Sequence, residues 1–289
     1  MEKNCVVQEK AYAKLNLTLK VLNKLSNNYH EIESHIVFLP KVFDKLIIKK
    51  SKINKVFITG EFSKILLNNG GDTLIYKSIK LLSELLRIKI NIEVRLQKNI
   101  PLGSGLGGGS ADAAAVVRAI IKLYKTVNKK DLIVQNLHKI GSDVPVCFFS
   151  KNAKVTGIGE QIKPLKKLDK KLWILLLKPN NNSSTQLIFN KFKNPFEKES
   201  SFCFNLENII SDMNKYKNSL ENTACKLDNN LAKILSSLPN HKNLVKPRIT
   251  GSGSTIFVIF ENKKNLLDYK DKAKIDNKKY WQKSTFLEL

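Results

Sequence analysis

Long apolar runs are missing from this sequence. A helix needs about 20 mostly apolar residues to span a bilayer, and uninterrupted apolar runs such as Leu172–Leu177 are far shorter. The opening Met-Glu-Lys-Asn-Cys also lacks an apolar stretch of signal-peptide length. The sequence therefore predicts a soluble, cytoplasmic protein that does not bind membranes.

Cysteine is scarce, and the few cysteines are scattered. Four occur among 289 residues, far apart and without a C-x-x-C pair. This spacing suits neither a disulfide framework nor a zinc site, and it is typical of proteins from a reducing compartment. The four are Cys5, Cys147, Cys203 and Cys225.

Acidic residues are half as frequent as basic ones. Fifty Lys and Arg against 25 Asp and Glu give a formal net charge of +25 at pH 7. Such an excess either attracts polyanions, meaning nucleic acid or phosphorylated small molecules, or reflects a general overuse of lysine along the chain. Because the lysines are scattered rather than clustered on one helix, we favour the compositional interpretation and expect no nucleic-acid partner.

Two familiar phosphate-transfer signatures are absent as well. The sequence has no G-K-[ST], which excludes a Walker A loop. It has neither H-R-D nor D-F-G, which excludes a protein kinase.

What the sequence has instead is a glycine-rich stretch, Pro101–Ala115, in which five of the first nine residues are glycine. Glycine adopts positive φ and leaves backbone N–H groups accessible, and Ser110 before a run of alanines predicts a helix with Ser110 as its N-cap. A glycine loop that leads into a helix is a phosphate site. Gly103–Gly108 also fits G-x-G-x-x-G, but the strand before it is polar at every second position, unlike the first strand of a dinucleotide-binding fold.

The rest of the chain has the mixed pattern of an α+β protein. Residues 13–21 alternate between apolar and polar, which predicts a half-buried strand with Lys14 and Asn16 on one face. A second such strand covers 88–96. Helices are expected after Asp72, over 113–124, and from Asp131 to 140.

Two polar residues have open roles at this point. Ser142-Asp143-Val144-Pro145 predicts a helix start with Ser142 as N-cap and proline in the first turn. From spacing alone, a solvent-facing Lys14 and a purely structural Asp143 are the simpler interpretations.

Three segments together resemble the GHMP small-molecule kinases. Pro101–Ala115 is similar to the central motif of that family, P-x-x-x-G-L-G-G-G-S-x-x-A-A. Ala13-Lys14-Leu15-Asn16-Leu17 resembles its first motif and Ile249-Thr250-Gly251-Ser252-Gly253-Ser254 its third, in the same order and at similar spacing. Further similarity comes from Tyr29-His30, Asp72–Tyr76 and Ile140–Pro145.

The resemblance implies a two-domain α+β fold. Residues 1–156 are expected to form the ATP-binding N-terminal domain, similar to domain 2 of ribosomal protein S5. Residues 157–289 are expected to form a ferredoxin-like substrate domain, with the site in the cleft between the domains.

The implied activity is an ATP-dependent kinase of the non-mevalonate isoprenoid pathway that phosphorylates the 2-hydroxyl of a cytidyl-diphosphate methylerythritol. By the same resemblance, Asp143 matches the base that accepts the hydroxyl proton, Lys14 neutralises charge around it, and Mg²⁺ sits between the ATP phosphates on ligands that remain unknown. The ATP phosphates would be wrapped by Pro101, Leu102, Gly103, Ser104, Gly105, Leu106, Gly107, Gly108, Gly109, Ser110 and Ala111.

Other positions match the substrate side of the family. The partner is a small molecule, and the protein is expected to be a monomer or weak homodimer. One departure is that the family's N-D-L-E is Asn218-Ser219-Leu220-Glu221 here, without its aspartate. The substrate-side residues are Asn16, Tyr29, His30, Thr185, Phe189, Gly251 and Ser252.

Two alternatives stay open from the sequence. Another GHMP kinase, for homoserine or mevalonate, would carry the same glycine loop. A basic nucleic-acid-binding protein would instead bind DNA or RNA tightly and with a steep dependence on salt.

Overall fold

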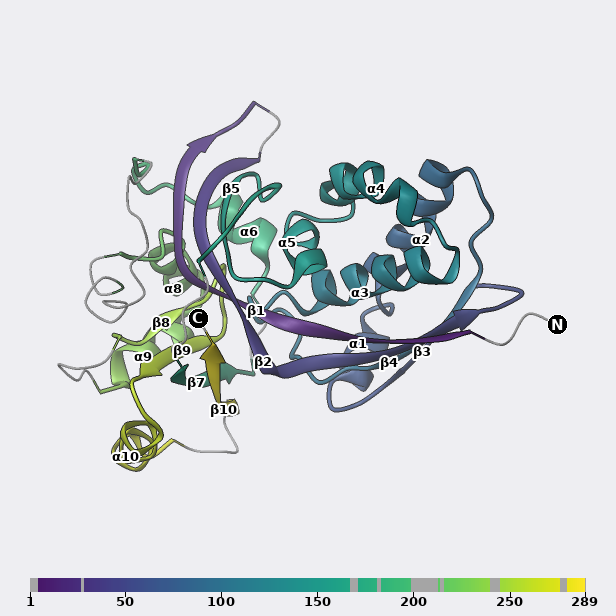
Figure 1. Cartoon of the computed structure of the whole chain (residues 1–289). Coiled ribbons are helices and arrows are strands. Elements are labelled where there is room, and N and C mark those ends of the chain that lie inside the picture. The colour runs from purple at the N-terminus through teal and green to yellow at the C-terminus, as the bar shows by residue number, and fades with distance from the viewer. Residues whose placement is uncertain are drawn as a thin grey trace. The chain divides into compact units, whose positions relative to one another are not determined.

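The computed structural model describes residues 5–26, 29–166, 171–180, 183–198, 213, 216–239, 245–275 and 280–288. The chain forms two compact units, each built from separate stretches of sequence. The first contains Met1–Ala13, Val42–Leu102 and Gly107–Lys151, and the second contains Lys14–Lys41, Gly103–Leu106 and Asn152–Leu289. The division into domains at residue 156 stays a prediction. Figure 1 labels the elements of both units.

Two long strands contribute residues to both units. β1 (Val6–Lys24) pairs with β2 (His30–Lys50). β2 is continuous through Pro40. Its neighbours explain this. β5 (Ala153–Gly157) pairs with Ile32–Ile36 and β4 (Ile92–Gln97) pairs with Lys45–Lys50, so Pro40 lies outside both ladders and its missing N–H removes no bond from them.

In the first unit, the end of β2 is followed across the sheet by β4 (Ile92–Gln97, antiparallel) and β3 (Lys55–Thr59, parallel to β4). The helices are α1 (Ser63–Asn68), α2 (Thr73–Leu86), α3 (Gly108–Leu123), α4 (Lys130–Asn136) and α5 (Val144–Phe149), with 3₁₀ turns at Val127–Lys129 and Leu137–Lys139. Asp72 caps α2 as predicted, whereas Asp131 lies inside the first turn of α4 and does not cap it.

Helix α3 is the core helix of the first unit. Its alanines and valines from Ala113 to Val117 are completely buried, and α2 and α5 pack against it. Small side chains let neighbouring helices approach closely, which explains the alanine-rich run after the glycine loop.

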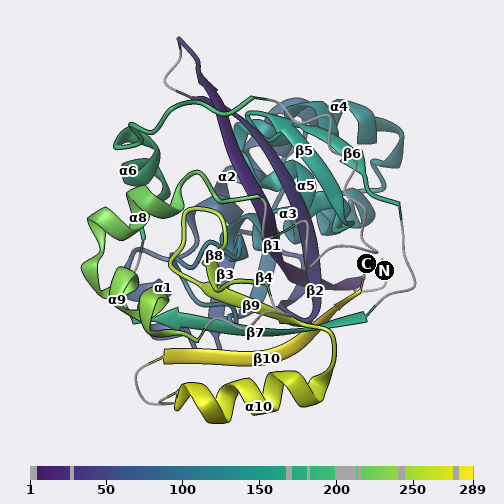
Figure 2. The same ribbon diagram turned by 90° about the vertical axis from the view of Figure 1, so that its left-hand side faces the viewer.

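The second unit holds an antiparallel sheet in the order β10 (Tyr280–Glu288), β7 (Lys171–Pro179), β9 (Ile256–Phe260) and β8 (Arg248–Ile249). It also holds β5 (Ala153–Gly157) and β6 (Gln161–Pro164). Apolar residues of the sheet pack with α6 (Thr185–Asn190), α8 (Glu221–Leu227), α9 (Asn229–Ser237) and α10 (Lys263–Ala273). Helix α10 packs against β7 and β9, and Figure 2 shows it running along this sheet.

The helices and strands confirm the α+β prediction. Among the described residues, no helix has the length and apolar character needed to cross a bilayer.

Candidate active site

The glycine loop begins and ends in the first unit, and its middle, Gly103–Leu106, belongs to the second. Gly103, Gly105 and Gly107 all have positive φ, at 54°, 74° and 69°. The predicted N-cap Ser110 is wrong, because α3 begins at Gly108 and Gly107 occupies the N-cap position. Since Gly107 has no side chain with which to cap the helix, the first N–H groups of α3 are suited to an anion.

Within the second unit, the middle of this loop contacts a second glycine loop, residues 249–254. The Thr255 N–H donates to the Ser104 carbonyl at 3.1 Å, and the Lys14 N–H donates to the Leu106 carbonyl at 2.9 Å. A Cβ on Gly105 would lie 2.3 Å from the Thr250 carbonyl oxygen. Glycine is therefore required at position 105 both by its positive φ and by this close approach.

Lys14 and Asn16 lie next to the second glycine loop. Lys14 Nζ donates to Asn16 Oδ1 at 2.5 Å, Asn16 Nδ2 donates to Ser34 Oγ at 2.7 Å, and the Asn16 N–H donates to Thr250 Oγ1 at 2.8 Å. A Cβ on Gly251 would lie 3.0 Å from Asn16 Oδ1 and 3.4 Å from Lys14 Nζ.

The prediction of a half-buried strand around these residues is wrong. All positions from Ala13 to Val21 are buried, including Lys14 and Asn16, each with 4% exposure. Hydrogen bonds from neighbouring segments compensate the buried polar side chains, so the polar face does not need water.

The substrate-side residues predicted in the second unit form two groups. The His30 ring is buried at 5.2 Å between centroids from Phe189, with an interplanar angle of 36°. Thr185 Oγ1 lies 2.8 Å from Ser252 Oγ. Tyr29 is exposed (54%) beside His30 in the sequence. Burial, with a smaller contribution from Lys24, lowers the pKa of His30, which favours the neutral ring.

Asp143 belongs to the first unit and is the N-cap residue of α5, with φ −86° and ψ −9°. The prediction of Ser142 as N-cap is wrong, whereas proline does lie in the first turn, at Pro145. The glycine loop approaches this turn within the same unit, because a Cβ on Gly141 would lie 4.0 Å from Ser110 Oγ. The first turn of α3 and the turn that carries Asp143 are therefore neighbours.

Comparison with known proteins gives a consistent result. The family described as GHMP kinases N terminal domain matches residues 73–151. A 4-diphosphocytidyl-2-C-methyl-D-erythritol kinase of Caldicellulosiruptor saccharolyticus is 33% identical over 92% of both chains. One of the same name from Thermoanaerobacter pseudethanolicus is 35% identical over 90% of this chain and 89% of the relative.

The chain belongs to the 4-diphosphocytidyl-2-C-methyl-D-erythritol kinase family of GHMP kinases. The fold agrees. A crystal structure of 4-(cytidine 5'-diphospho)-2C-methyl-D-erythritol kinase matches with a TM-score of 0.74 at 24% identity, covering 98% of this chain and all of the other. Homoserine kinase from Cytophaga hutchinsonii matches with a TM-score of 0.69 at 17% identity, covering 100% and 96%. The predicted two-domain GHMP-kinase fold and the prediction of a small-molecule kinase are confirmed.

The departure from the GHMP-kinase pattern at 218–221 keeps a structural role. Asn218 Nδ2 donates to the carbonyls of Ile249 (3.0 Å) and Gly251 (2.7 Å), and Glu221 Oε2 accepts from the Ile249 N–H at 2.9 Å. Ser219, which replaces the aspartate, donates from its hydroxyl to Glu197. The side chains of Asn218 and Glu221 therefore hold the backbone of the second glycine loop.

Sequence reasoning missed several polar residues of this GHMP kinase. Thr18 Oγ1 and His35 Nδ1 lie 2.8 Å apart, and burial lowers the pKa of His35 to about 4. Ser34 and Thr250 bind Asn16. Alternation places Thr18 on the same face of β1 as Asn16, but Ser34 can be placed opposite Asn16 only once the pairing of β1 with β2 is known.

One cavity of about 1080 Å³ lies apart from the predicted site residues. It is formed within the first unit by β1, β2, β3, β4, α3 and α5, and its lining includes Tyr12, Phe57 and Arg95. None of the predicted catalytic, ATP-binding or substrate-side residues lines it.

Proposed function

We propose that this chain transfers the γ-phosphoryl group of ATP to the 2-hydroxyl of 4-diphosphocytidyl-2-C-methyl-D-erythritol, in the non-mevalonate route to isoprenoid precursors. The observation that carries the proposal is the similarity to curated kinases of that name over about nine-tenths of the chain. The fold alone does not choose the substrate, because homoserine and mevalonate kinases share it.

In this proposal, residues 101–111 bind the ATP phosphates. The support is local: positive-φ glycines, an N-cap without a side chain, and a helix N-terminus whose N–H groups and dipole favour negative charge. Phosphoryl transfer asks little covalent chemistry of a protein, so positioning and charge stabilisation by such a loop supply most of the catalysis.

Asp143 is the proposed general base, and Lys14 the proposed charge-neutralising group. The substrate oxygen attacks the γ-phosphorus, the bond to the β,γ-bridging oxygen breaks, ADP leaves, and the hydroxyl proton passes to the Asp143 carboxylate. A buried ammonium held by Asn16 supports the role of Lys14, since a fixed cation in a water-poor site stabilises developing negative charge strongly.

The substrate's cytosine is proposed to stack in the region of Tyr29, His30 and Phe189. Stacking of a base on an aromatic ring contributes about 1–3 kcal/mol, and the neutral, buried His30 ring beside Phe189 supports this role. Asn16, Gly251, and the hydroxyls of Thr185 and Ser252 are the proposed polar contacts to the rest of the substrate.

Mg²⁺ belongs to the proposal as the companion of ATP. Across the described residues, no group of three His, Cys, Asp or Glu side chains could hold a metal ion. This fits Mg²⁺, which commonly binds one or two protein oxygens and completes its shell with water and phosphate. Ser110, in the first turn of α3, is the side-chain oxygen of the glycine loop that would hold it. When bound, the ion neutralises phosphate charge.

The test is an ATP-dependent assay against a panel of alcohols: the cytidyl-diphosphate methylerythritol, homoserine and mevalonate. We expect ADP formation and a new phosphomonoester with the first compound alone, and loss of turnover when EDTA removes Mg²⁺. Turnover with homoserine or mevalonate instead would overturn the substrate assignment.

We also propose a cytoplasmic location and a monomer or weak homodimer, which fractionation and sedimentation can check.

A further inference from the structure

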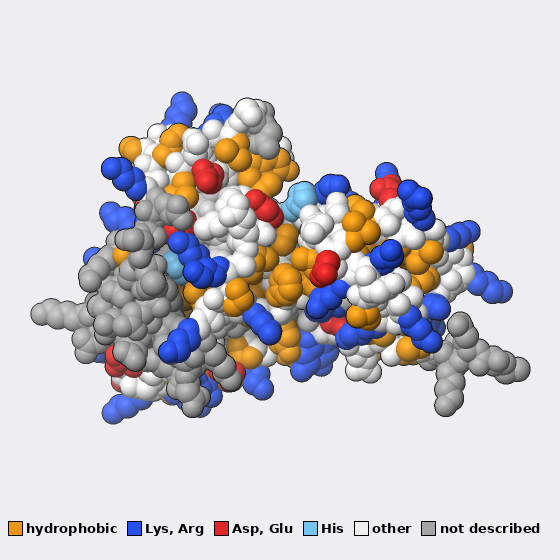
Figure 3. Space-filling model, turned by 45° about the horizontal axis from the view of Figure 1, so that its top comes forward, with side chains coloured by type: hydrophobic (Ala, Val, Ile, Leu, Met, Phe, Trp, Pro, Cys, Tyr) orange, Lys and Arg blue, Asp and Glu red, His pale blue; other side chains and the backbone are white. Residues whose placement is uncertain are grey.

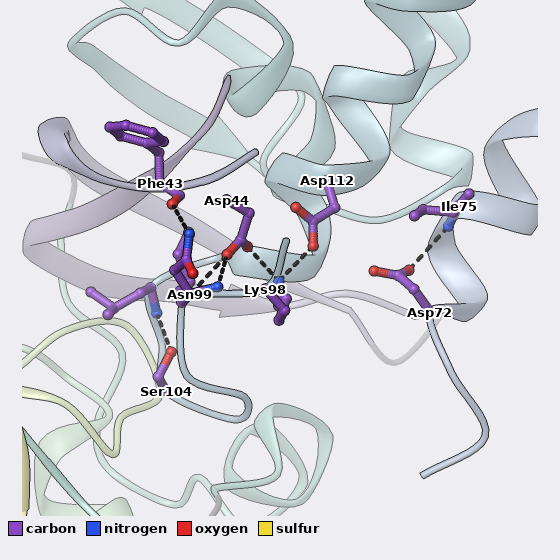
Figure 4. Close-up of polar contacts among 10 residues, drawn as sticks. Phe43, Asp44, Asp72, Ile75, Lys98, Asn99, Ser104 and Asp112 are labelled. Carbon is purple, nitrogen blue, oxygen red and sulfur yellow. Dashed lines mark hydrogen bonds and ion pairs between the residues drawn. The ribbon is translucent and has the colours of Figure 1, made fainter. Parts of the chain in front are cut away.

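A buried cation with two carboxylate partners lies beneath the glycine loop in the first unit. Lys98 Nζ donates to Asp44 Oδ2 at 2.6 Å and to Asp112 Oδ2 at 2.5 Å. Lys98 is 1% exposed, and both carboxylates are fully buried. Figure 4 shows the ammonium between the two aspartates, so that one side chain connects β2, the end of β4 and α3.

The same cluster fixes the chain as it enters the glycine loop. Asp44 Oδ1 accepts from the N–H groups of Asn99 (2.5 Å) and Ile100 (2.8 Å), the two residues directly before Pro101. The Lys98 N–H donates to the Thr59 carbonyl at 2.7 Å. The segment before the loop is therefore held to β2 and to the end of β3.

The cluster also fixes the chain as it leaves the loop. Asp112 is the fifth residue of α3, and a Cβ on Gly108, the first residue of α3, would lie 3.0 Å from Lys98 Nζ. The ammonium and the Ile100 side chain lie beside the first turn of α3, and both would crowd a side chain at residue 108. The residues directly before the proposed phosphate-binding loop and those at its end are thus both held by the Lys98 cluster.

Electrostatics argue that the cluster does more than stabilise the fold. Burial acts to lower the pKa of Lys98, but the Asp112 and Asp44 carboxylates outweigh it and raise that pKa above its ordinary value. Because two carboxylates share this one ammonium, burial together with the neighbouring Asp44 raises the pKa of Asp112 even though Lys98 acts to lower it. Among the described residues, Asp112 Oδ1 has no hydrogen-bond partner. Well-packed apolar residues are often at least as stabilising as such buried ions, so stability alone does not account for the cluster.

We propose that Lys98 is a positioning residue for nucleotide binding. Its ammonium, held by Asp44 and Asp112, sets the two ends of the glycine loop so that the first N–H groups of α3 meet the phosphates of ATP. The inference rests on the proposed function in one respect, namely that residues 101–111 bind ATP.

The test compares Lys98→Met with the double variant Lys98→Met/Asp112→Leu. The single variant leaves two buried carboxylates without their cation, so we expect a lower melting temperature and about ten- to a hundredfold weaker ATP binding. In the double variant only Asp44 is left without the cation, and it still accepts from the Asn99 and Ile100 N–H groups, so we expect the melting temperature to recover in part while ATP binding stays weak. The readouts are calorimetric ATP titration and thermal melting, with KM for the alcohol expected to change by less than about threefold.

Lys45→Met is the matched control, because it removes an exposed lysine next to Asp44 in β2. We expect its ATP affinity to stay within about twofold of wild type.

If folded Lys98→Met binds ATP normally, or if the double variant regains stability and ATP affinity together, Lys98 is merely structural and the inference is wrong. ATP titration needs no alcohol. A wild type that binds ATP but does not phosphorylate the cytidyl compound would therefore overturn the proposed substrate and leave the inference about Lys98 standing. A wild type that binds no ATP would overturn both.

Discussion

At the scale of single residues, the proposed chemistry depends on one carboxylate in the first unit. We predict that Asp143→Asn lowers kcat by about 10²–10⁴-fold, the usual contribution of positioned proton transfer. ATP binding should remain, because the amide keeps the size of the side chain and the glycine loop is untouched. Steady-state kinetics and ATP titration check this.

The control for Asp143→Asn is Asp131→Asn, which changes an exposed aspartate in the first turn of α4. Its kcat and ATP affinity should equal those of wild type. A kcat for Asp143→Asn within about tenfold of wild type, or loss of ATP binding in a folded Asp143→Asn protein, would contradict the role of general base.

A second residue-scale prediction concerns pH. Burial raises the pKa of Asp112 above that of the unfolded chain, so the folded state holds the proton more tightly. The resulting stabilisation is complete below the unfolded pKa of about 4 and is lost as pH rises through the raised folded pKa. Asp112→Asn removes this titration. Denaturant unfolding at several pH values measures the free energy of unfolding of both proteins. The value for Asp112→Asn minus the value for wild type should increase with pH across this window.

A flat difference for Asp112→Asn would mean that the carboxyl titrates as it does in the unfolded chain. Its burial would then not govern its protonation.

At the scale of elements, the contact between the two glycine loops inside the second unit has a clear test. Gly105 has φ +74°, and a Cβ there would lie 2.3 Å from a backbone oxygen of Thr250. Gly70 also has positive φ, at +87°, but has nothing within 4 Å. Gly70→Ala should therefore cost only the left-handed backbone strain, about 1–2 kcal/mol. Gly105→Ala should cost more, because the backbone at Thr250 has to move.

Chemical denaturation measures both free energies of unfolding, and kinetics measures the KM for ATP and for the alcohol. We expect Gly105→Ala to raise at least one KM and Gly70→Ala to leave both unchanged. Equal losses of stability in the two variants would mean that the close approach of residue 105 to Thr250 does not contribute to the free energy of unfolding.

Most elements are predictable from the sequence because their signals are local. Alternation indicates β1, and Asp72 marks the start of α2. What fails for β1 depends on distant partners: from Ala13 to Val21 both faces are buried, because other segments cover the face that alternation assigned to solvent. The N-cap of α3 also differs from the prediction, since Gly107 rather than Ser110 occupies that position.

The candidate site is less predictable than the fold for the same reason. Spacing alone left Lys14 as a solvent-facing residue, and only the family resemblance singled it out. The pairs Asn16 with Thr250 and His30 with Phe189 join residues far apart in the chain. Lys98 carries no local signal, since a lysine after a strand is ordinary in a chain with 50 Lys and Arg residues.

At the scale of the whole molecule, the net charge of +25 needs an interpretation consistent with a small-molecule kinase. On the face shown in Figure 3, Lys and Arg side chains are spread out and do not gather into one patch. A nucleic-acid site needs a concentrated basic surface that releases counterions together. Scattered charge favours weak, non-specific association instead.

We therefore predict that DNA or RNA binds only in the non-specific range, with Kd of about 10⁻⁴–10⁻⁶ M at physiological salt. Neutralising any one of three exposed lysines on separate segments, Lys55→Gln, Lys151→Gln or Lys264→Gln, should weaken that binding by a similar small factor. The reason is that each scattered lysine contributes about one counterion to the salt dependence. Filter binding over a salt series measures the effect, and kcat for phosphorylation should not change in any of the three. If one substitution abolished most of the binding, or if the wild type bound nucleic acid saturably with a nanomolar Kd, the protein would have a specific nucleic-acid-binding site. The net positive charge would then serve nucleic-acid binding.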